Sequence, residues 1–113
     1  MRNIDQGLQT GIDGVFFNPN GNPQFIITES KFRTTPPRSP QDLLSNTRDG
    51  LQLSDSWITG EVTRRRRLRD EVGRDLSRQI LLEGYERKLV HINPLGEVTI
   101  HELDYLGNIV YGN

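Results

Sequence analysis

Two short apolar runs on either side of a turn-forming segment constrain the fold of this chain most strongly. Val15-Phe16-Phe17 and Phe25-Ile26-Ile27 flank "NPNGNP" at 18–23. Asn-Gly is a strong tight-turn signal, and aromatic and β-branched residues favour strands. We therefore predict an antiparallel hairpin with strands at 15–17 and 24–32, so the fold must contain a β-sheet.

Charged residues gather at the end of this hairpin that lies far from the turn. Asp13 precedes the first run, and Glu29 and Lys31 end the second. Residues equally distant from the turn lie side by side in a hairpin, and residues two apart share a sheet face. We expect these three side chains to converge, with Ser30 pointing to the opposite face.

The rest of the chain contains helical and strand patterns in succession. "RTTPPRS" at 33–39 reads as a loop because of its prolines, and "PQDLLSNTRDG" at 40–50 as a loop or one helical turn. Ser54 is a plausible N-cap for a helix, and a second helical stretch spans about 67–84 with Gly84 as its stop. The apolar positions of these helices are Trp57, Ile58 and Val62, then Leu68, Val72, Leu76, Ile80 and Leu81.

Strand-forming residues return in the last third of the chain. "RKLVHIN", "EVTIHEL" and "NIVYG" are separated by the turns "PLG" and "YLG". Strands, then helices, then strands indicate an α+β fold, with a mixed or antiparallel sheet and the hairpin packed against one or two helices.

Composition limits the classes of protein to consider. A chain of 113 residues suggests one domain over 1–113, and 33% apolar residues with a mean hydropathy of −0.63 leave a modest core. The absence of cysteine excludes disulfides and cysteine-ligated zinc. No apolar run is long enough to span a bilayer, so we expect no membrane partner.

The converging hairpin residues form an oxygen-rich site. Two carboxylates and the Ser30 backbone carbonyl suit Mg²⁺ or Mn²⁺, which prefer hard oxygen ligands. Such an ion polarises a phosphate and activates water, and Lys31 could orient that water or stabilise negative charge. The plainer alternative is an exposed Glu–Lys pair beside an aspartate that forms a turn.

The sequence around these residues resembles that of a known family. Asp13 followed by Glu29-Ser30-Lys31 matches the core motif of the PD-(D/E)XK nucleases, which include restriction endonucleases. "GIDGVFF", "ITESKF" and the later "QLSDSWI" together resemble the nuclease toxin domains of bacterial polymorphic toxins. These are effectors of contact-dependent inhibition, Rhs-type and related secretion systems. The resemblance covers about residues 11 to 58. Ile12 departs from the family motif, in which proline often precedes the aspartate.

The resemblance implies a role for each matched residue. Asp13 and Glu29 would bind Mg²⁺ or Mn²⁺, with Zn²⁺ less favoured, and Lys31 would be the catalytic lysine. Gln52 would lie near the scissile phosphate, while Asp55 and Trp57 would fix a helix on the sheet. Many family members also carry a glutamate on a helix before the first strand. Only about ten residues precede the motif here, so that element would be shortened or missing and the chain could be a C-terminal fragment of a larger toxin.

The function implied is a metal-dependent endonuclease that acts as an interbacterial toxin. DNA is the favoured substrate, and tRNA or other RNA is the alternative. A cognate immunity protein would be the partner, and a bacterial secretion system would deliver the toxin to the target-cell cytoplasm. A different class remains open, namely a non-catalytic nuclease-like binding module.

A run of arginines is the other conspicuous charge feature, although the net charge of the chain is only −1. Arg64, Arg65, Arg66 and Arg67 could contact nucleic-acid phosphates together with Lys31, or simply cover a solvated helix face. An acidic partner could also dock there. His91 and His101 read as ordinary strand histidines rather than as a second metal site.

Overall fold

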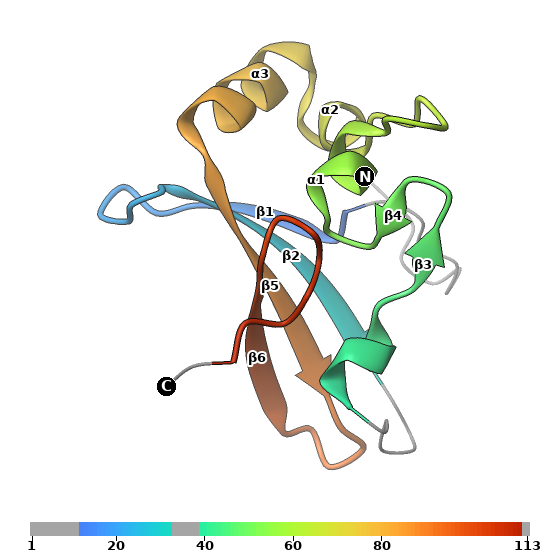
Figure 1. The fold of residues 1–113 in the computed structure, drawn as a ribbon. Coiled ribbons are helices and arrows are strands. Elements are labelled where there is room, and N and C mark those ends of the chain that lie inside the picture. Colours follow the sequence, from blue (N-terminus) through green and yellow to red (C-terminus); the bar gives the residue numbers. More distant parts are fainter. Residues whose placement is uncertain (1–11, 33–38, 112–113) are drawn as a thin grey trace.

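The structure is a computed structural model, and it describes residues 12–32 and 39–111. Its elements follow one another as two strands, a helical middle and two further strands (Figure 1). Their bounds are β1 Gly14–Phe17, β2 Phe25–Phe32, the 3₁₀ helix η2 Pro40–Leu43, β3 Asn46–Thr47, β4 Gly50–Leu51, α1 Asp55–Thr59, α2 Arg67–Val72, α3 Arg74–Glu83, β5 Tyr85–Ile92 and β6 Val98–Leu103.

The four long strands form one sheet in the order β1-β2-β5-β6. The β1–β2 and β5–β6 pairs are antiparallel, whereas β2 and β5 are parallel. Parallel neighbours need a crossover connection, and the helices provide it here. The prediction of an α+β fold with a mixed sheet is confirmed.

The predicted hairpin is present and is closed by its own turn. The Asn18 amide donates to the Gln24 carbonyl at 2.7 Å, and the Gly21 amide donates to the Asn18 carbonyl at 3.0 Å. Pairing of Gly14 with Thr28 and of Phe17 with Phe25 sets the register. Continued by one residue, this register places Asp13 opposite Glu29.

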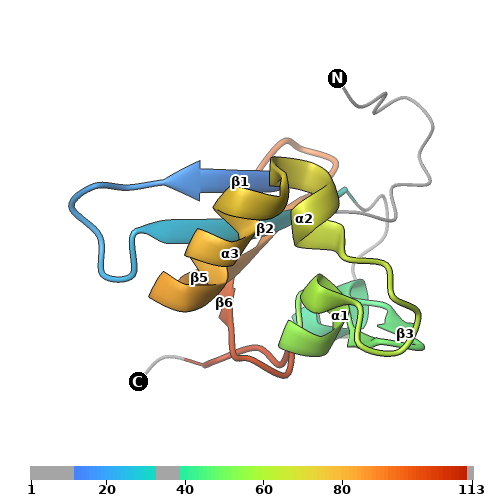
Figure 2. The same cartoon turned by 90° about the horizontal axis from the view of Figure 1, so that it is seen from above.

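In Figure 1, α1, α2 and α3 lie together in the upper part of the view, and in Figure 2, seen from above, α2 and α3 lie in front of β1 and β2. The sheet face that carries Ile27 and Leu89 is buried in the core with Trp57, Leu68 and Ile80. The other face is much more open. Four large apolar side chains on it are 58–61% exposed, namely Phe16, Phe32, Val98 and Ile100. Within residues 12–32 and 39–111, α1, α2 and α3 therefore cover a single face of the sheet.

The helical middle differs in detail from the sequence prediction. Ser54 caps α1 as expected, its hydroxyl accepting from the Trp57 amide, but α1 ends at Gly60 in a left-handed conformation (φ 70°). Val62 therefore lies outside the helix and is exposed. The prediction of one continuous helix over about 67–84 is wrong, because Gly73 (φ 92°) divides it into α2 and α3.

Residues 40–50 contain more regular structure than the predicted loop or single turn. A 3₁₀ turn leads into the two-residue strands β3 and β4, which pair as an antiparallel ribbon. In the tail, "NIVYG" contributes only an isolated bridge between Leu103 and Ile109. The predicted loop at 33–39 lies outside the described residues except for Ser39. Within residues 12–32 and 39–111, no helix combines the length and apolarity that crossing a bilayer would need.

Candidate active site

The open end of the hairpin carries the predicted charged cluster. The Ser30 amide donates to Asp13 Oδ2 at 2.9 Å, which ties the residue before β1 to β2. Lys31 Nζ lies 3.4 Å from Glu29 Oε2, and both side chains belong to one face of β2. Asp13, Glu29 and Lys31 thus lie together, as the strand spacing predicts, and Ser30 is exposed on the other face.

Glu29 is the most unusual member of this cluster. Its side chain is 2% exposed, and its Oε1 is buried with no hydrogen-bond partner among the described residues. Burial and the nearby Asp13 carboxylate raise the pKa of Glu29 from 4.5 to about 7, against the opposing effect of Lys31. A buried carboxylate with an unsatisfied oxygen and a near-neutral pKa is typical of a functional site.

The donor set of this cluster suits a hard divalent cation. Asp13 and Glu29 supply carboxylate oxygens, and the Ser30 carbonyl is the third candidate ligand. Glu29 Oε1, which has no hydrogen-bond partner in residues 12–32 and 39–111, is a candidate ligand atom. No group of three or more His, Cys, Asp or Glu side chains gathers for a metal within the described part of the chain. An ion held here would therefore keep several waters, as Mg²⁺ does.

His91 is a neighbour of this cluster that the sequence alone did not reveal. It pairs with Lys31 across the parallel β2–β5 ladder, so the two side chains share a sheet face. Its Nε2 is buried without a hydrogen-bond partner in the described ranges. The strand pattern around His91 carried no such signal, because only the long-range pairing of β2 with β5 brings it beside Lys31.

The described contacts of Gln52 do not include any residue of the carboxylate cluster. It is 6% exposed, and its Oε1 accepts a hydrogen bond from the Ser45 amide at 2.9 Å. The side chain lines a cavity of about 390 Å³ whose described lining contains none of Asp13, Glu29 and Lys31. The predicted role of Gln52 beside the scissile phosphate stays a prediction.

Asp55 and Trp57 do fix α1 on the sheet, as predicted. Asp55 Oδ1 accepts hydrogen bonds from the Tyr85 hydroxyl and from Arg87, both on β5. Trp57 is 1% exposed and belongs to the core. Desolvation raises the pKa of Tyr85 to about 12, so Tyr85 remains a donor to Asp55 over the physiological pH range.

The arginine run divides into an exposed and a buried part. Arg64, Arg65 and Arg66 are exposed, whereas Arg67 is 6% exposed. The Arg67 guanidinium donates to Asp49 Oδ2 at 2.9 Å and to the Trp57 carbonyl at 2.6 Å. It also stacks over the Trp57 ring at 4.6 Å. Arg67 is thus part of the packed interior, and Arg64, Arg65 and Arg66 are the exposed part of the run.

Asp49 is a second buried carboxylate, and it differs from Glu29 in its partners. Burial alone would raise its pKa. Hydrogen bonds from Thr63, Arg67 and Val62 outweigh this and hold the pKa of Asp49 well below its usual range. The Val62 and Thr63 amides reach Oδ1 at 2.7 and 2.8 Å. Asp49 therefore ties the loop after α1 to the β3–β4 ribbon.

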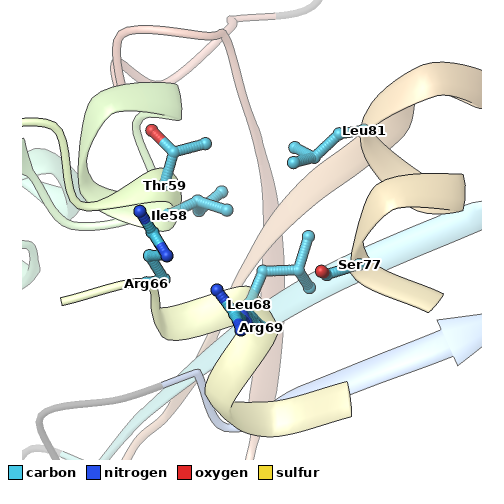
Figure 3. A pocket seen from close by; sticks show the side chains of 7 residues that line it. All are labelled: Ile58, Thr59, Arg66, Leu68, Arg69, Ser77 and Leu81. Atoms are coloured by element: carbon cyan, nitrogen blue, oxygen red, sulfur yellow. The ribbon is translucent and has the colours of Figure 1, made fainter. Parts of the chain in front are cut away.

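A smaller cavity of about 180 Å³ lies among the three helices (Figure 3). Ile58, Leu68 and Leu81 supply its apolar lining, and Arg66 and Arg69 lie beside it. None of the carboxylate cluster at the hairpin lines this cavity in the described ranges. We therefore treat it as separate from the candidate active site.

Comparison with known proteins returns no relative of this chain. No family model, no curated protein and no solved structure matches it.

Proposed function

We propose that this protein is a metal-dependent endonuclease that cleaves phosphodiester bonds, with DNA as the favoured substrate. One observation carries the proposal. Asp13, Glu29 and Lys31 meet at the open end of one hairpin, and Glu29 is buried there with its Oε1 unpartnered among the residues that the structure describes. Burying a carboxylate oxygen without a hydrogen-bond partner is costly. An ion pair that only stabilised the fold would not need this cost, so the arrangement favours a functional role for Glu29.

The fold part of the proposal is that the hairpin, the mixed sheet and the helices form a restriction-endonuclease-like core. The crossover from β2 to the parallel strand β5 is compatible with this, since it places the Glu-x-Lys segment inside the sheet with a neighbour on each side. The motif resemblance at Asp13, at Glu29 to Lys31 and at 52–58 supports the same assignment.

Each residue of the cluster has a chemical task in the proposed reaction. Asp13 and Glu29, with the Ser30 carbonyl, would hold Mg²⁺ or Mn²⁺. Zn²⁺ is less suited to an all-oxygen donor set. When bound, the cation polarises the phosphate and lowers the pKa of a coordinated water. Lys31 lies within ion-pair distance of Glu29, so its ammonium can orient water and stabilise negative charge on the phosphate.

The reaction is hydrolysis by in-line displacement at phosphorus. The water oxygen forms a bond to phosphorus while the bond to the leaving oxygen breaks. The proton lost by water passes to solvent or to a nearby base, and the leaving oxygen takes a proton from solvent to become a hydroxyl group. The active-site residues are equally suited to DNA and RNA strands, because they act on the phosphate. The choice of DNA rests on the motif resemblance alone.

The biological setting that we propose is antagonism between bacteria. A secretion system would deliver the nuclease into the cytoplasm of a target cell, and a cognate immunity protein would protect the producer. The motif resemblance supports this setting. Expression of the protein in bacteria tests this setting. We expect it to kill the cells, and we expect co-expression of the neighbouring open reading frame to prevent the killing.

Purified protein tests the chemistry directly. We expect Mg²⁺-dependent degradation of plasmid DNA or tRNA that EDTA stops. Asp13→Ala and Lys31→Ala should abolish this cleavage while circular dichroism remains unchanged. Robust cleavage by either variant would contradict the mechanism. A wild-type protein that cleaves no nucleic acid with any of several divalent ions would favour the non-catalytic binding module.

A further inference from the structure

The open face of the sheet carries an apolar patch at the end where the β5–β6 turn lies, which is the lower end in Figure 1. Strand register places two rows of side chains there, namely Ser30–Val90–Ile100 and Phe32–Ile92–Val98. Phe32, Val98 and Ile100 are 58–61% exposed, and Val90 and Ile92 between them are half-buried. We call these five apolar residues the sheet-end patch.

A polar row borders the sheet-end patch. The register aligns Thr28, Lys88 and Glu102 across β2, β5 and β6, on the same sheet face as the patch. Lys88 Nζ lies 4.0 Å from Glu102 Oε1 on the next strand and 3.6 Å from Glu86 Oε2 on its own strand. An apolar centre beside a charged border is the usual anatomy of a protein–protein interface, in which a polar rim surrounds an apolar core.

The β5–β6 turn adds an ordered apolar side chain next to the patch. Leu95 in this turn is 86% exposed, more than any other large apolar side chain among the residues that the structure describes. Asn93 Oδ1 accepts from the Leu95 and Glu97 amides at 2.9 Å each, and Asn93 Nδ2 donates to Glu97 Oε1 at 2.7 Å. The turn is therefore held by its own hydrogen bonds, so covering Leu95 in a contact would cost little ordering entropy.

The exposed apolar area is of the size that an interface between two small proteins needs. At roughly 100 Å² for each of Phe32, Leu95, Val98 and Ile100, the patch and its turn present about 400 Å² of apolar surface. An interface is roughly 60% apolar, so this corresponds to about 700 Å² per partner, close to the roughly 800 Å² of a standard interface. The patch is large enough to hold one partner by itself.

Charge and symmetry favour a second copy of this chain as that partner. The net charge is only −1, so two copies repel each other weakly. A two-fold symmetric contact joins the same surface of both copies, and an apolar patch is complementary to itself. The border contains both signs of charge, through Lys88 and Glu102, so it can also pair with its own copy.

We propose that two copies of this chain pack face to face through the sheet-end patch and the Leu95 turn. Sheets that pack in this way lie about 10 Å apart, with the side chains of the two inner faces interdigitated. Glu29 and Lys31 belong to the opposite face of β2, so the dimer carries its two carboxylate clusters on its outer faces. The dimer does not depend on the proposed nuclease function, and the experiments that test it measure no cleavage.

Sedimentation equilibrium from micromolar to near-millimolar protein measures self-association. We expect the apparent mass to rise with concentration from 13.0 kDa towards about 26 kDa, twice the mass of one chain. The association should persist in high NaCl and strengthen in sulfate, because apolar burial rather than ion pairing drives it. A protein that stays monomeric at every concentration, or a dimer that high NaCl dissociates, would overturn the proposal.

Charged substitutions test whether the sheet-end patch forms the contact. Phe32→Asp and Ile100→Asp should each weaken dimerisation by about 100-fold or more, because an unpaired carboxylate would be buried in the contact. Leu82→Asp makes the same change at an 81% exposed position on α3 and should leave dimerisation unchanged. Val98→Lys repeats the test if circular dichroism shows that one patch variant does not fold. Equal dimerisation in the patch variants and in Leu82→Asp would contradict the assignment.

The absence of cysteine from the chain permits a direct test of which face is covered. Ile100→Cys should react with a bulky maleimide more slowly as the protein concentration rises, whereas Leu82→Cys should react at a constant rate. Equal behaviour of the two positions in a dimeric solution would place the interface elsewhere and refute the proposal. Monomeric protein that binds the dye ANS, with loss of binding in Phe32→Asp, would assign the patch to a different partner and equally refute it.

Discussion

Two Glu-x-Lys segments lie on adjacent parallel strands of the same sheet, and only one of them resembles an active site. Glu29 and Lys31 on β2 are 3.4 Å apart, and Glu86 and Lys88 on β5 are 3.6 Å apart. The β2–β5 register pairs Glu86 with Ile26, so the second segment faces the opposite side of the sheet. Spacing and ion-pair geometry are therefore nearly identical in the two segments.

Burial is what distinguishes them. The Glu29 side chain is 2% exposed, and the Glu86 side chain is 36% exposed. Glu29 has Asp13 nearby, a near-neutral pKa and an oxygen that no described residue contacts by a hydrogen bond, whereas Glu86 lies on the more open face of the sheet. A Glu-x-Lys motif thus becomes a candidate catalytic site through the face on which it lies. Glu86 is a matched internal control for Glu29.

The largest expected difference is in activity. Glu29→Gln should lower the rate of nucleic-acid cleavage by about 10³-fold, the equivalent of about 4 kcal/mol, because it removes a proposed metal ligand. Glu86→Gln should leave the rate unchanged. Single-turnover cleavage with Mg²⁺ measures both. Equal cleavage rates for the two variants would contradict the assignment of Glu29 rather than Glu86 to the active site.

The next difference is in the pH dependence of stability without metal. Glu29 has a pKa near 4.5 in the unfolded chain and about 7 in the folded protein, so the folded protein keeps the Glu29 proton up to a higher pH. The contribution of Glu29 to the free energy of unfolding should be greatest below pH 4.5 and fall by about 3 kcal/mol as pH rises through 7. Denaturant titrations across this range should show the fall in wild type and in Glu86→Gln. The Glu29→Gln protein should lack this pH-dependent component and be more stable than wild type above pH 7.

A smaller effect is expected from metal. At ten times its Kd, Mg²⁺ should stabilise the folded wild-type protein by about 1.4 kcal/mol at pH 8, since the unfolded chain has no assembled site. Thermal unfolding with increasing Mg²⁺ measures this shift. The shift should persist in Glu86→Gln and vanish in Glu29→Gln and Asp13→Ala. A shift that survives in Glu29→Gln would mean that the ion binds elsewhere.

The smallest effect separates the causes of the Glu29 pKa. Burial is the main cause and the Asp13 carboxylate the second, while Lys31 acts in the opposite direction. Asp13→Asn should therefore move the midpoint of the pH-dependent stability to lower pH, and Lys31→Met should move it to higher pH. Lys88→Met is the matched control and should not move it. A midpoint that shifts in the same direction in both cluster variants would contradict these assignments.

Local features of this fold were predictable from the sequence. The two apolar runs on either side of the Asn-, Gly- and Pro-rich segment predict the hairpin, and its register, which pairs Phe17 with Phe25, brings Asp13, Glu29 and Lys31 together. Ser54 as the N-cap of α1 and Gly84 as the end of α3 were also readable, because capping depends on neighbouring residues.

Features that depend on distant partners were not predictable in this way. Nothing within the arginine run distinguishes Arg67 from Arg66, since the burial of Arg67 depends on Asp49 and Trp57. The approach of His91 to Lys31 likewise requires the pairing of β2 with β5. The sequence around Gly73 does not indicate a helix break, because the apolar positions on both sides of it keep a helical period.

The parallel pairing of β2 with β5 has a consequence for how the site comes into being. The hairpin can form early from contacts between near neighbours, but its partner strand β5 lies beyond all three helices in the chain. Closing so long a segment is entropically costly and slow. A chain that ends before Tyr85 retains Asp13, Glu29 and Lys31 but lacks the strand beside Glu29. Its glutamate would titrate as in an unfolded peptide, so we expect the raised pKa of Glu29 to arise only once β5 has paired with β2.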